Sequence, residues 1–123
     1  MSRILIVDDD QRMLQLLGDC FKHAYTVEIA TNGGEALAIV RRQRPDLVLL
    51  DIMLPGMSGI HLLKQIKETD PTIAVVMMTG NDSAALAAEA LQSGAADYVL
   101  KPFALHDLNR LVADIIAKAS ETG

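Results

Sequence analysis

The sequence predicts an α/β fold in which five parallel strands alternate with five helices. Five short apolar runs, rich in β-branched residues and leucine, recur along the chain, as in strands that are buried on both faces of a parallel sheet. The stretches between these runs carry apolar residues at helical spacing. Because strict alternation with right-handed crossovers places helices on both faces of the sheet, we expect a doubly wound arrangement.

The predicted strands have no alternating polar pattern, so both faces of the sheet are expected to be covered. Their residue ranges are 4–7, 26–30, 46–50, 73–78 and 98–100. Each run is too short for a typical helix, and prolines precede the third and fourth runs. The last run ends at the Lys101-Pro102 pair.

The predicted helices are recognised by apolar stripes and by capping residues. The stripes of the first three are Met13, Leu14, Leu17, Cys20 and Phe21, then Ala36, Leu37 and Val40, then Leu62, Leu63 and Ile66. The fourth carries Leu86, Ala90 and Leu91, and the fifth, from about Leu105, carries Leu108, Leu111, Val112, Ile115 and Ile116. Expected N-caps are Asp10, Ser58 and either Asp82 or Ser83, and Gly94 is expected to stop the fourth helix.

Length and composition favour one domain over residues 1–123 and exclude several functions. A chain of 123 residues can bury one hydrophobic core. The net charge of -5 and the scarcity of aromatic residues argue against direct nucleic-acid binding. There is no apolar run of membrane-spanning length. The single cysteine, Cys20, suits a reducing compartment, so we expect a cytoplasmic protein without a leader.

Polar residues follow four of the five predicted strands directly. They are Asp8 and Asp9, Asp51, Thr79, and Lys101. Each has an ordinary explanation alone, such as helix capping or a turn. Because the carboxyl ends of parallel strands meet at one edge, where such folds bind ligands, their joint placement indicates a site. The carboxylates are hard oxygen ligands that suit Mg²⁺.

Four segments of the chain closely resemble the signature segments of response-regulator receiver domains. They are ILIVDDD, DLVLLDIMLPGMSG, VVMMTG and DYVLKPF, and the resemblance spans essentially the whole chain. It implies a flavodoxin-like fold with strand order 2-1-3-4-5 and a cis bond between Lys101 and Pro102. It also implies a phosphoacceptor domain of a two-component or phosphorelay system, either a stand-alone regulator or the N-terminal part of a longer one.

The resemblance implies a role for individual residues of the metal site. Asp51 resembles the phosphorylated residue, Asp9 a direct metal ligand, and Asp8 an acidic residue that acts mainly through water. Met53 would add its backbone carbonyl. The expected ion is Mg²⁺, for which Mn²⁺ can substitute. Because an apolar Met53 side chain cannot position a hydrolytic water, we also expect slow self-dephosphorylation.

The resemblance further implies a switch and its partners. Thr79 and Lys101 would contact the phosphoryl group, and Tyr98 would pack inward when Thr79 moves toward it. The fourth helix, fifth strand and fifth helix would form the output face, which controls an output domain or downstream protein, with homodimerisation on phosphorylation. The donor would be a phosphohistidine on a sensor histidine kinase or phosphotransfer protein. Such a domain phosphorylates and dephosphorylates itself and is not a turnover enzyme; similar receivers are attached to transcription-activating ATPase domains.

Three other interpretations remain open at this point. A haloacid-dehalogenase-type phosphatase would use Asp8 and Asp10 as a D-x-D pair, but it leaves Asp51 without a role. A flavin-binding module needs glycines and hydroxyls in the first turn, which is acidic here. A degenerate receiver could act only as a scaffold, although all the acceptor residues are present.

The remaining charged features are expected to be structural. His23, His61 and His106 have no spacing typical of a metal cluster, so we assign them no role. Arg41, Arg42 and Arg44 are expected to form a solvated helix end. The fourth helix, rich in alanine, is expected to be loosely packed and mobile.

Overall fold

The computed structural model describes residues 1–80 and 84–122 and confirms the predicted fold. Within these residues, one parallel sheet has the strand order β2-β1-β3-β4-β5. Its strands are β1 (Arg3–Val7), β2 (Thr26–Ala30), β3 (Leu47–Asp51), β4 (Ala74–Thr79) and β5 (Asp97–Leu100). The helices are α1 (Gln11–Phe21), α2 (Gly33–Gln43), α3 (Gly59–Thr69), α4 (Ala84–Gln92) and α5 (Leu105–Thr122).

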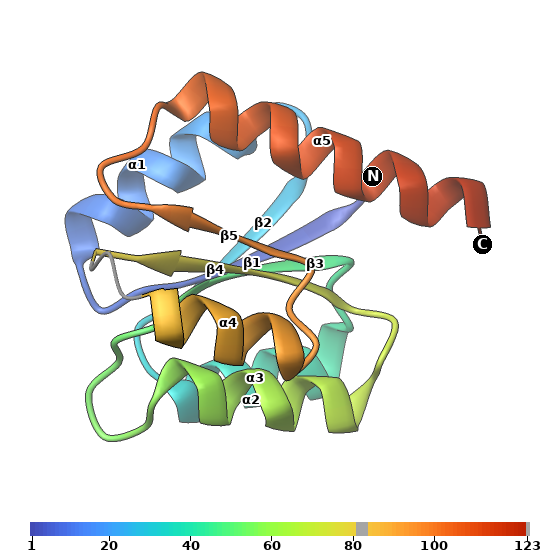
Figure 1. Ribbon diagram of the computed structural model, residues 1–123. Coiled ribbons are helices and arrows are strands. Elements are labelled where there is room, and N and C mark those ends of the chain that lie inside the picture. Colours follow the sequence, from blue (N-terminus) through green and yellow to red (C-terminus); the bar gives the residue numbers. More distant parts are fainter. Residues whose placement is uncertain (81–83, 123) are drawn as a thin grey trace.

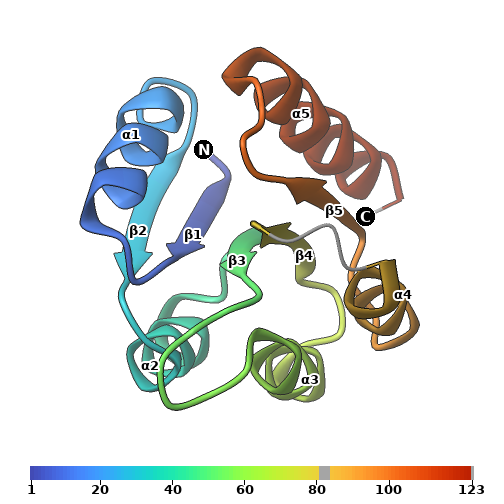
Figure 2. The same ribbon diagram turned by 60° about the vertical axis from the view of Figure 1, so that its left-hand side comes forward.

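Helices cover both faces of the sheet, as the continuous apolar strands predict (Figure 1). Helices α1 and α5 lie on one face, and α2, α3 and α4 lie on the other (Figure 2). Strand β1 contributes side chains to the hydrophobic cluster on each face of the sheet. Leu5 and Val7 belong to the cluster under α2 and α3, and Ile4 and Ile6 belong to the cluster under α1 and α5. The interior is therefore two aliphatic layers separated by the sheet.

The helix termini mostly agree with the capping predictions. The Asp10 side chain accepts a hydrogen bond from the Arg12 amide, and Ser58 accepts one from the His61 amide. Gly94, with φ of 107°, follows α4 as a left-handed stop. The predicted caps of α4, Asp82 and Ser83, lie outside the described residues. The structure adds Asn32, which caps α2 by accepting from the Glu35 amide.

Several details of the prediction were wrong. Strands β1 and β5 each begin one residue earlier than predicted, at Arg3 and at Asp97. Strands β3 and β4 each begin and end one residue later than predicted, because backbone pairing continues through Asp51, opposite Met78, and through Thr79, opposite Leu100. Leu91 was expected on the apolar side of α4, but 43% of it is exposed. Helix α4 lies beside the edge strand β5, so little of the sheet is available to cover that side chain.

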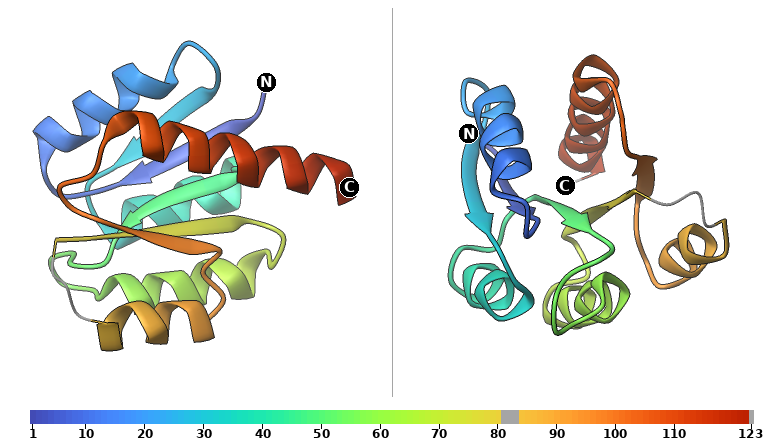
Figure 3. Two further views of the ribbon diagram at one scale, coloured as in Figure 1. Left: turned by 45° about the horizontal axis from the view of Figure 1, so that its top comes forward. Right: turned by 90° about the vertical axis from the view of Figure 1, so that its left-hand side faces the viewer.

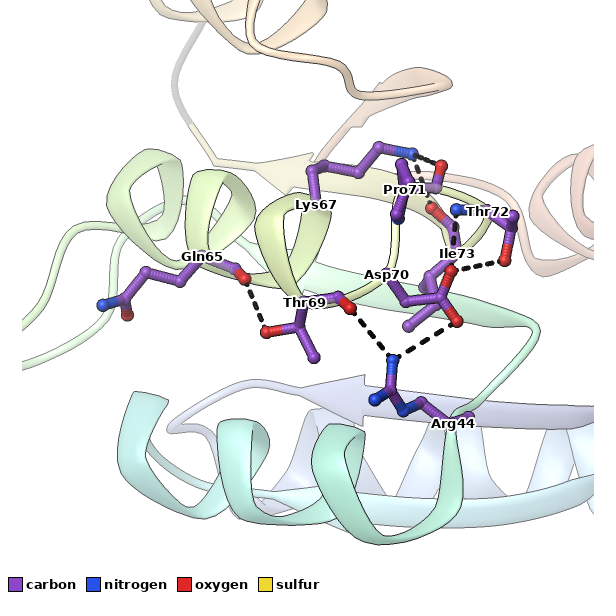
Figure 4. Close-up of polar contacts among 8 residues, drawn as sticks. All are labelled: Arg44, Gln65, Lys67, Thr69, Asp70, Pro71, Thr72 and Ile73. Atoms are coloured by element: carbon purple, nitrogen blue, oxygen red, sulfur yellow. Dashed lines mark hydrogen bonds and ion pairs between the residues drawn. The ribbon is translucent and has the colours of Figure 1, made fainter.

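A cluster of polar contacts connects the ends of α2 and α3 at the amino-terminal edge of the sheet (Figure 4). Arg44 caps α2 in the left-handed region with φ of 47°. Its guanidinium donates to the Thr69 carbonyl at 3.0 Å and lies 3.5 Å from the Asp70 carboxylate. Arg44 was expected to be merely solvated, but it joins the ends of α2 and α3. Hydrogen bonds from Thr72 hold the pKa of Asp70 below its usual value.

All strands run in the same direction, so their carboxyl ends meet at the opposite edge (Figure 3). In this strand order the direction of winding reverses between β1 and β3. The predicted site residues therefore converge beside that reversal. In the described part of the chain, no helix combines the length and apolar character needed to cross a membrane.

Candidate functional site: an acidic cluster at the carboxyl edge of the sheet

Three aspartates converge where β1 and β3 end. Val7 pairs with Leu50, so the residues that follow, Asp8 and Asp51, are neighbours on adjacent strands. Carboxylate oxygens of Asp8, Asp9 and Asp51 all lie within 4.8 Å of one another. Asp8 is fully buried, Asp51 is 6% exposed, and Asp9 is exposed. Two buried carboxylates this close to each other need compensating positive charge.

Lys101 brings one positive charge into the cluster. Its ammonium lies 2.9 Å from Asp8 Oδ2 and 3.5 Å from Asp51 Oδ2. The Lys101 amide donates to the Thr79 carbonyl at 2.7 Å, which extends the pairing of β4 with β5 by one residue. The Lys101-Pro102 bond is cis, as the resemblance implied. One ammonium therefore lies between two carboxylates and leaves the group of three with excess negative charge.

The pKa values of Asp51 and Lys101 reflect this arrangement of charges. Burial raises the pKa of Asp51 above its usual value, and the charge of Asp8 raises it further. The Met53 amide hydrogen bond and the Lys101 charge oppose this increase without cancelling it. Burial alone would lower the pKa of Lys101, but the hydrogen bond to Asp8 and the charges of Asp51 and Asp8 raise it overall. Lys101 is therefore a stable cation in the cluster.

Backbone amides orient two of the carboxylates. The Met53 amide donates to Asp51 Oδ1 at 3.1 Å, and the Asp10 amide donates to Asp8 Oδ1 at 2.9 Å. The Met53 side chain is 67% exposed beside the acceptor strand. Asp10 itself is exposed and caps α1, so the partner that a D-x-D phosphatase needs is held in a capping role.

Thr79 and Tyr98 lie on the neighbouring strands. Thr79 ends β4 and is 1% exposed. It follows Met78, which pairs with Asp51, so it lies next to the acidic cluster. Tyr98 is 36% exposed on β5 and pairs with Met77. The ring is at the surface in this structure, and its inward movement stays a prediction.

Gly59 lies close to the acceptor strand, in a contact that the sequence did not reveal. Gly59 is the first residue of α3, and its amide donates to the Ile52 carbonyl at 2.9 Å. It therefore lies against the backbone that follows Asp51. The three histidines are exposed, in agreement with the solvated positions expected for them.

Comparison with known proteins identifies the same architecture. The family model described as "Response regulator receiver domain" matches residues 4–113. The chain is 35% identical over 119 residues to the response regulator MprA of Mycobacterium sp. (strain KMS), covering 96% of this chain and 52% of that protein. It is 40% identical over 113 residues to the regulatory protein AtoC of Escherichia coli (strain K12), covering 91% of this chain and 24% of that protein.

Solved structures agree over the whole chain. A CheY-like receiver domain protein from Methanospirillum hungatei JF-1 is 34% identical, has a TM-score of 0.96, and the match covers 100% of this chain and 99% of that one. NtrX from Brucella abortus is 30% identical with a TM-score of 0.92, over 98% of this chain and 28% of that one. This chain spans about half the length of its MprA relatives. It belongs to the response-regulator receiver family and is the receiver domain of a two-component response regulator.

Proposed function

We propose that this receiver domain accepts a phosphoryl group on Asp51 in a Mg²⁺-dependent reaction. The donor is a phosphohistidine on a sensor histidine kinase or phosphotransfer protein. The observation that carries the proposal is the cluster of charged side chains, in which the buried Asp51 carboxylate lies with two further carboxylates and the Lys101 ammonium at the switch point of the sheet. Clustered residues with perturbed pKa values at such a position are functional candidates.

The carboxylate cluster suits a hard divalent cation. Carboxylate and carbonyl oxygens are the ligands that Mg²⁺ prefers, and three carboxylates beside one ammonium leave negative charge for a cation to neutralise. Asp9, Asp51 and the Met53 carbonyl would hold the ion, with Asp8 acting mainly through water. Mn²⁺ prefers similar ligands and can substitute. When bound, the ion would neutralise charge on the transferring phosphoryl oxygens.

The protein's own groups then perform the transfer. An oxygen of the Asp51 carboxylate attacks the phosphorus, the bond from phosphorus to the donor imidazole nitrogen breaks, and an acyl phosphate forms on Asp51. The leaving imidazole takes a proton from solvent. Lys101, already 3.5 Å from Asp51 Oδ2, and the Thr79 hydroxyl contact the phosphoryl oxygens. Hydrolysis later regenerates the carboxylate, so the domain is a switch and not a turnover enzyme.

The response is a change of the face formed by α4, β5 and α5. When Thr79 moves toward the phosphoryl group, Tyr98 packs inward from its present exposed position. The same region exposes Leu91 and Leu100, 43% and 48% respectively, which supports contact with an output domain, a downstream protein or a second phosphorylated copy. The phosphoryl group shifts this equilibrium only if it interacts unequally with the two states.

The proposal also covers the domain organisation of the protein and its location in the cell. The regulators that the chain matches are longer, so we propose that residues 1–123 form a receiver domain that is either N-terminal to an output domain or acts alone. A cytoplasmic location, expected from the sequence, stays a prediction.

Intact mass spectrometry tests the proposed reaction. The protein is incubated with Mg²⁺ and acetyl phosphate, beside an Asp51→Asn variant and a sample containing a chelator. We expect the mass of one phosphoryl group to be added to the wild type and to neither control. A wild type that gains no mass, under conditions in which a known receiver is modified, would favour the degenerate scaffold instead.

A further inference from the structure

The first turn of α3 lies directly against the backbone that carries the acceptor. A Cβ atom at Gly59 would lie 2.6 Å from the Asp51 carbonyl oxygen, 2.6 Å from Ile52 Cα and 2.8 Å from the Ile52 carbonyl oxygen. These neighbours are backbone atoms, so no side-chain rotation can relieve the overlap. The positive-φ glycines among the described residues are Gly56 and Gly94. Gly59 is therefore required for space and not for an unusual backbone conformation.

The loop between β3 and α3, residues 52–58, is also held from a second side. A Cβ atom at Gly33, the first residue of α2, would lie 2.6 Å from the Met57 sulfur. Met57 thus packs on the first turn of α2, next to the position that a side chain at residue 33 would occupy. This contact involves the flexible end of a side chain, so it can adjust at lower cost than the contact at Gly59.

The same loop carries the groups that set the geometry of the acceptor. The Met53 amide donates to Asp51 Oδ1, from a residue only two positions further along the chain. The Gly59 amide donates to the Ile52 carbonyl, inside this short segment. A side chain at residue 59 would push α3 away from the strand end and lengthen that bond. The displacement would pass directly to Ile52 and Met53.

We infer that Gly59 is a positioning residue of the acceptor site. Its missing side chain allows α3 to lie against the end of β3, and this fixes the Met53 backbone relative to the Asp51 carboxylate. The inference rests on the proposed function, because its consequence is expressed in the affinity for Mg²⁺. The loop is then held by two contacts, one with backbone atoms at Gly59 that cannot adjust, and one with the flexible Met57 side chain at Gly33 that can.

The test compares alanine substitutions at glycines with different surroundings. For Gly59→Ala we expect Mg²⁺ affinity to fall about tenfold, the size of effect typical for residues that orient metal ligands. Affinity is measured by amide NMR titration with Mg²⁺ alone. In the metal-free protein, the Met53 amide resonance should also shift. At Gly18 an added Cβ atom would meet nothing within 4 Å, so Gly18→Ala is the matched control and should leave both measurements unchanged.

A destabilised variant elsewhere separates positioning from general loss of stability. Val112 is fully buried on the opposite face of the sheet from α3. Val112→Ala should lower the melting temperature while keeping the Mg²⁺ affinity of the wild type. Equal loss of affinity in Val112→Ala and Gly59→Ala would overturn the inference. Wild-type affinity in a folded Gly59→Ala protein would overturn it as well.

The Gly33 contact keeps the inference testable if Gly59→Ala does not fold. Gly33→Ala should reduce Mg²⁺ affinity by a smaller factor, and a second substitution, Met57→Ala, should restore it by removing the clash. No loss in Gly33→Ala, or no recovery in the double variant, would then overturn the inference. A wild-type protein that does not bind Mg²⁺ would refute the proposed function, and the inference would fall with it.

Discussion

Replacing Asp51 with asparagine is expected to stabilise the metal-free protein. The introduced amide would have nearly the shape of the carboxylate, and its oxygen can still accept the Met53 amide hydrogen bond that Asp51 Oδ1 accepts at 3.1 Å. The substitution removes one negative charge from a cluster of three carboxylates, two of which are buried. The Asp51 carboxylate is therefore expected to lower the stability of the metal-free fold, although it is needed for function.

The size of the expected stabilisation follows from the distances between the charged groups of the acidic cluster. Carboxylate oxygens within 4.8 Å repel by about 3.5 kcal/mol per pair of charges at an effective dielectric of about 20. The Lys101 ammonium, 3.5 Å from Asp51, attracts it by about 4.7 kcal/mol at the same dielectric. Since Asp51 faces two carboxylates and one ammonium, repulsion dominates by about 2 kcal/mol, and solvent around Asp9 reduces this. We expect a gain of about 1–2 kcal/mol, or roughly 3–8 °C in melting temperature.

The pH dependence of the gain has a definite sign. The pKa of Asp51 is raised in the folded protein, chiefly by burial and further by Asp8. The folded state therefore holds this proton more tightly than the unfolded state, and the wild type loses stability as pH rises through the folded pKa. The advantage of Asp51→Asn should be full above the raised pKa of the folded state and should disappear as pH falls toward the ordinary pKa value of 3.8.

Thermal unfolding followed by circular dichroism, in a chelator and at several pH values, measures this difference. Asp114→Asn removes an exposed carboxylate on α5 and should change little. Mg²⁺ at about ten times its dissociation constant should add about 1.4 kcal/mol to the wild type and much less to Asp51→Asn. A variant no more stable than the wild type at pH 7 without metal would refute the electrostatic reasoning.

Three further predictions concern lifetime, stability and dynamics. Met53→Asn places an amide that can orient water beside the acceptor. The phosphoryl group should therefore be lost about five to ten times faster, which corresponds to about 1 kcal/mol of activation barrier. An unchanged rate of loss, followed by intact mass spectrometry, would contradict this. Thr72→Val removes a hydroxyl that donates to Asp70 at 2.6 Å. Because that bond lowers the Asp70 pKa, the variant should lose about 1 kcal/mol in urea unfolding at pH 7, and the loss should vanish as pH falls through the lowered pKa; an equal loss at low pH would count against it. Amide hydrogen exchange should be faster in α4 than in β3, and equal protection would show that α4 is not loosely packed.

The strands and the composition of the site could be predicted because both depend on local sequence. Runs such as residues 4–7 read as buried strands in any context, and polar residues at their ends must share one edge if the strands are parallel. The strand order itself came from the family resemblance, since alternation of strands and helices is compatible with several orders. The structure confirms that order.

What the sequence did not predict depends on distant partners. Arg44 reads as one of three arginines at a helix end, and only the fold brings it to Asp70. Leu91 fits the helical stripe, but the position of α4 at the sheet edge leaves it exposed. Gly59 is compatible with a turn, and its contact with the Asp51 backbone becomes visible only when α3 is placed against β3.

The most direct test of the central claim is to locate the phosphoryl group. The phosphorylated protein is treated with borohydride, which reduces an acyl phosphate to the corresponding alcohol, and peptide mass spectrometry then identifies the residue that has become homoserine. We predict conversion at Asp51 and at neither Asp8 nor Asp9. Conversion at Asp8 or Asp9, or phosphate that survives borohydride on a hydroxyl side chain, would contradict the account.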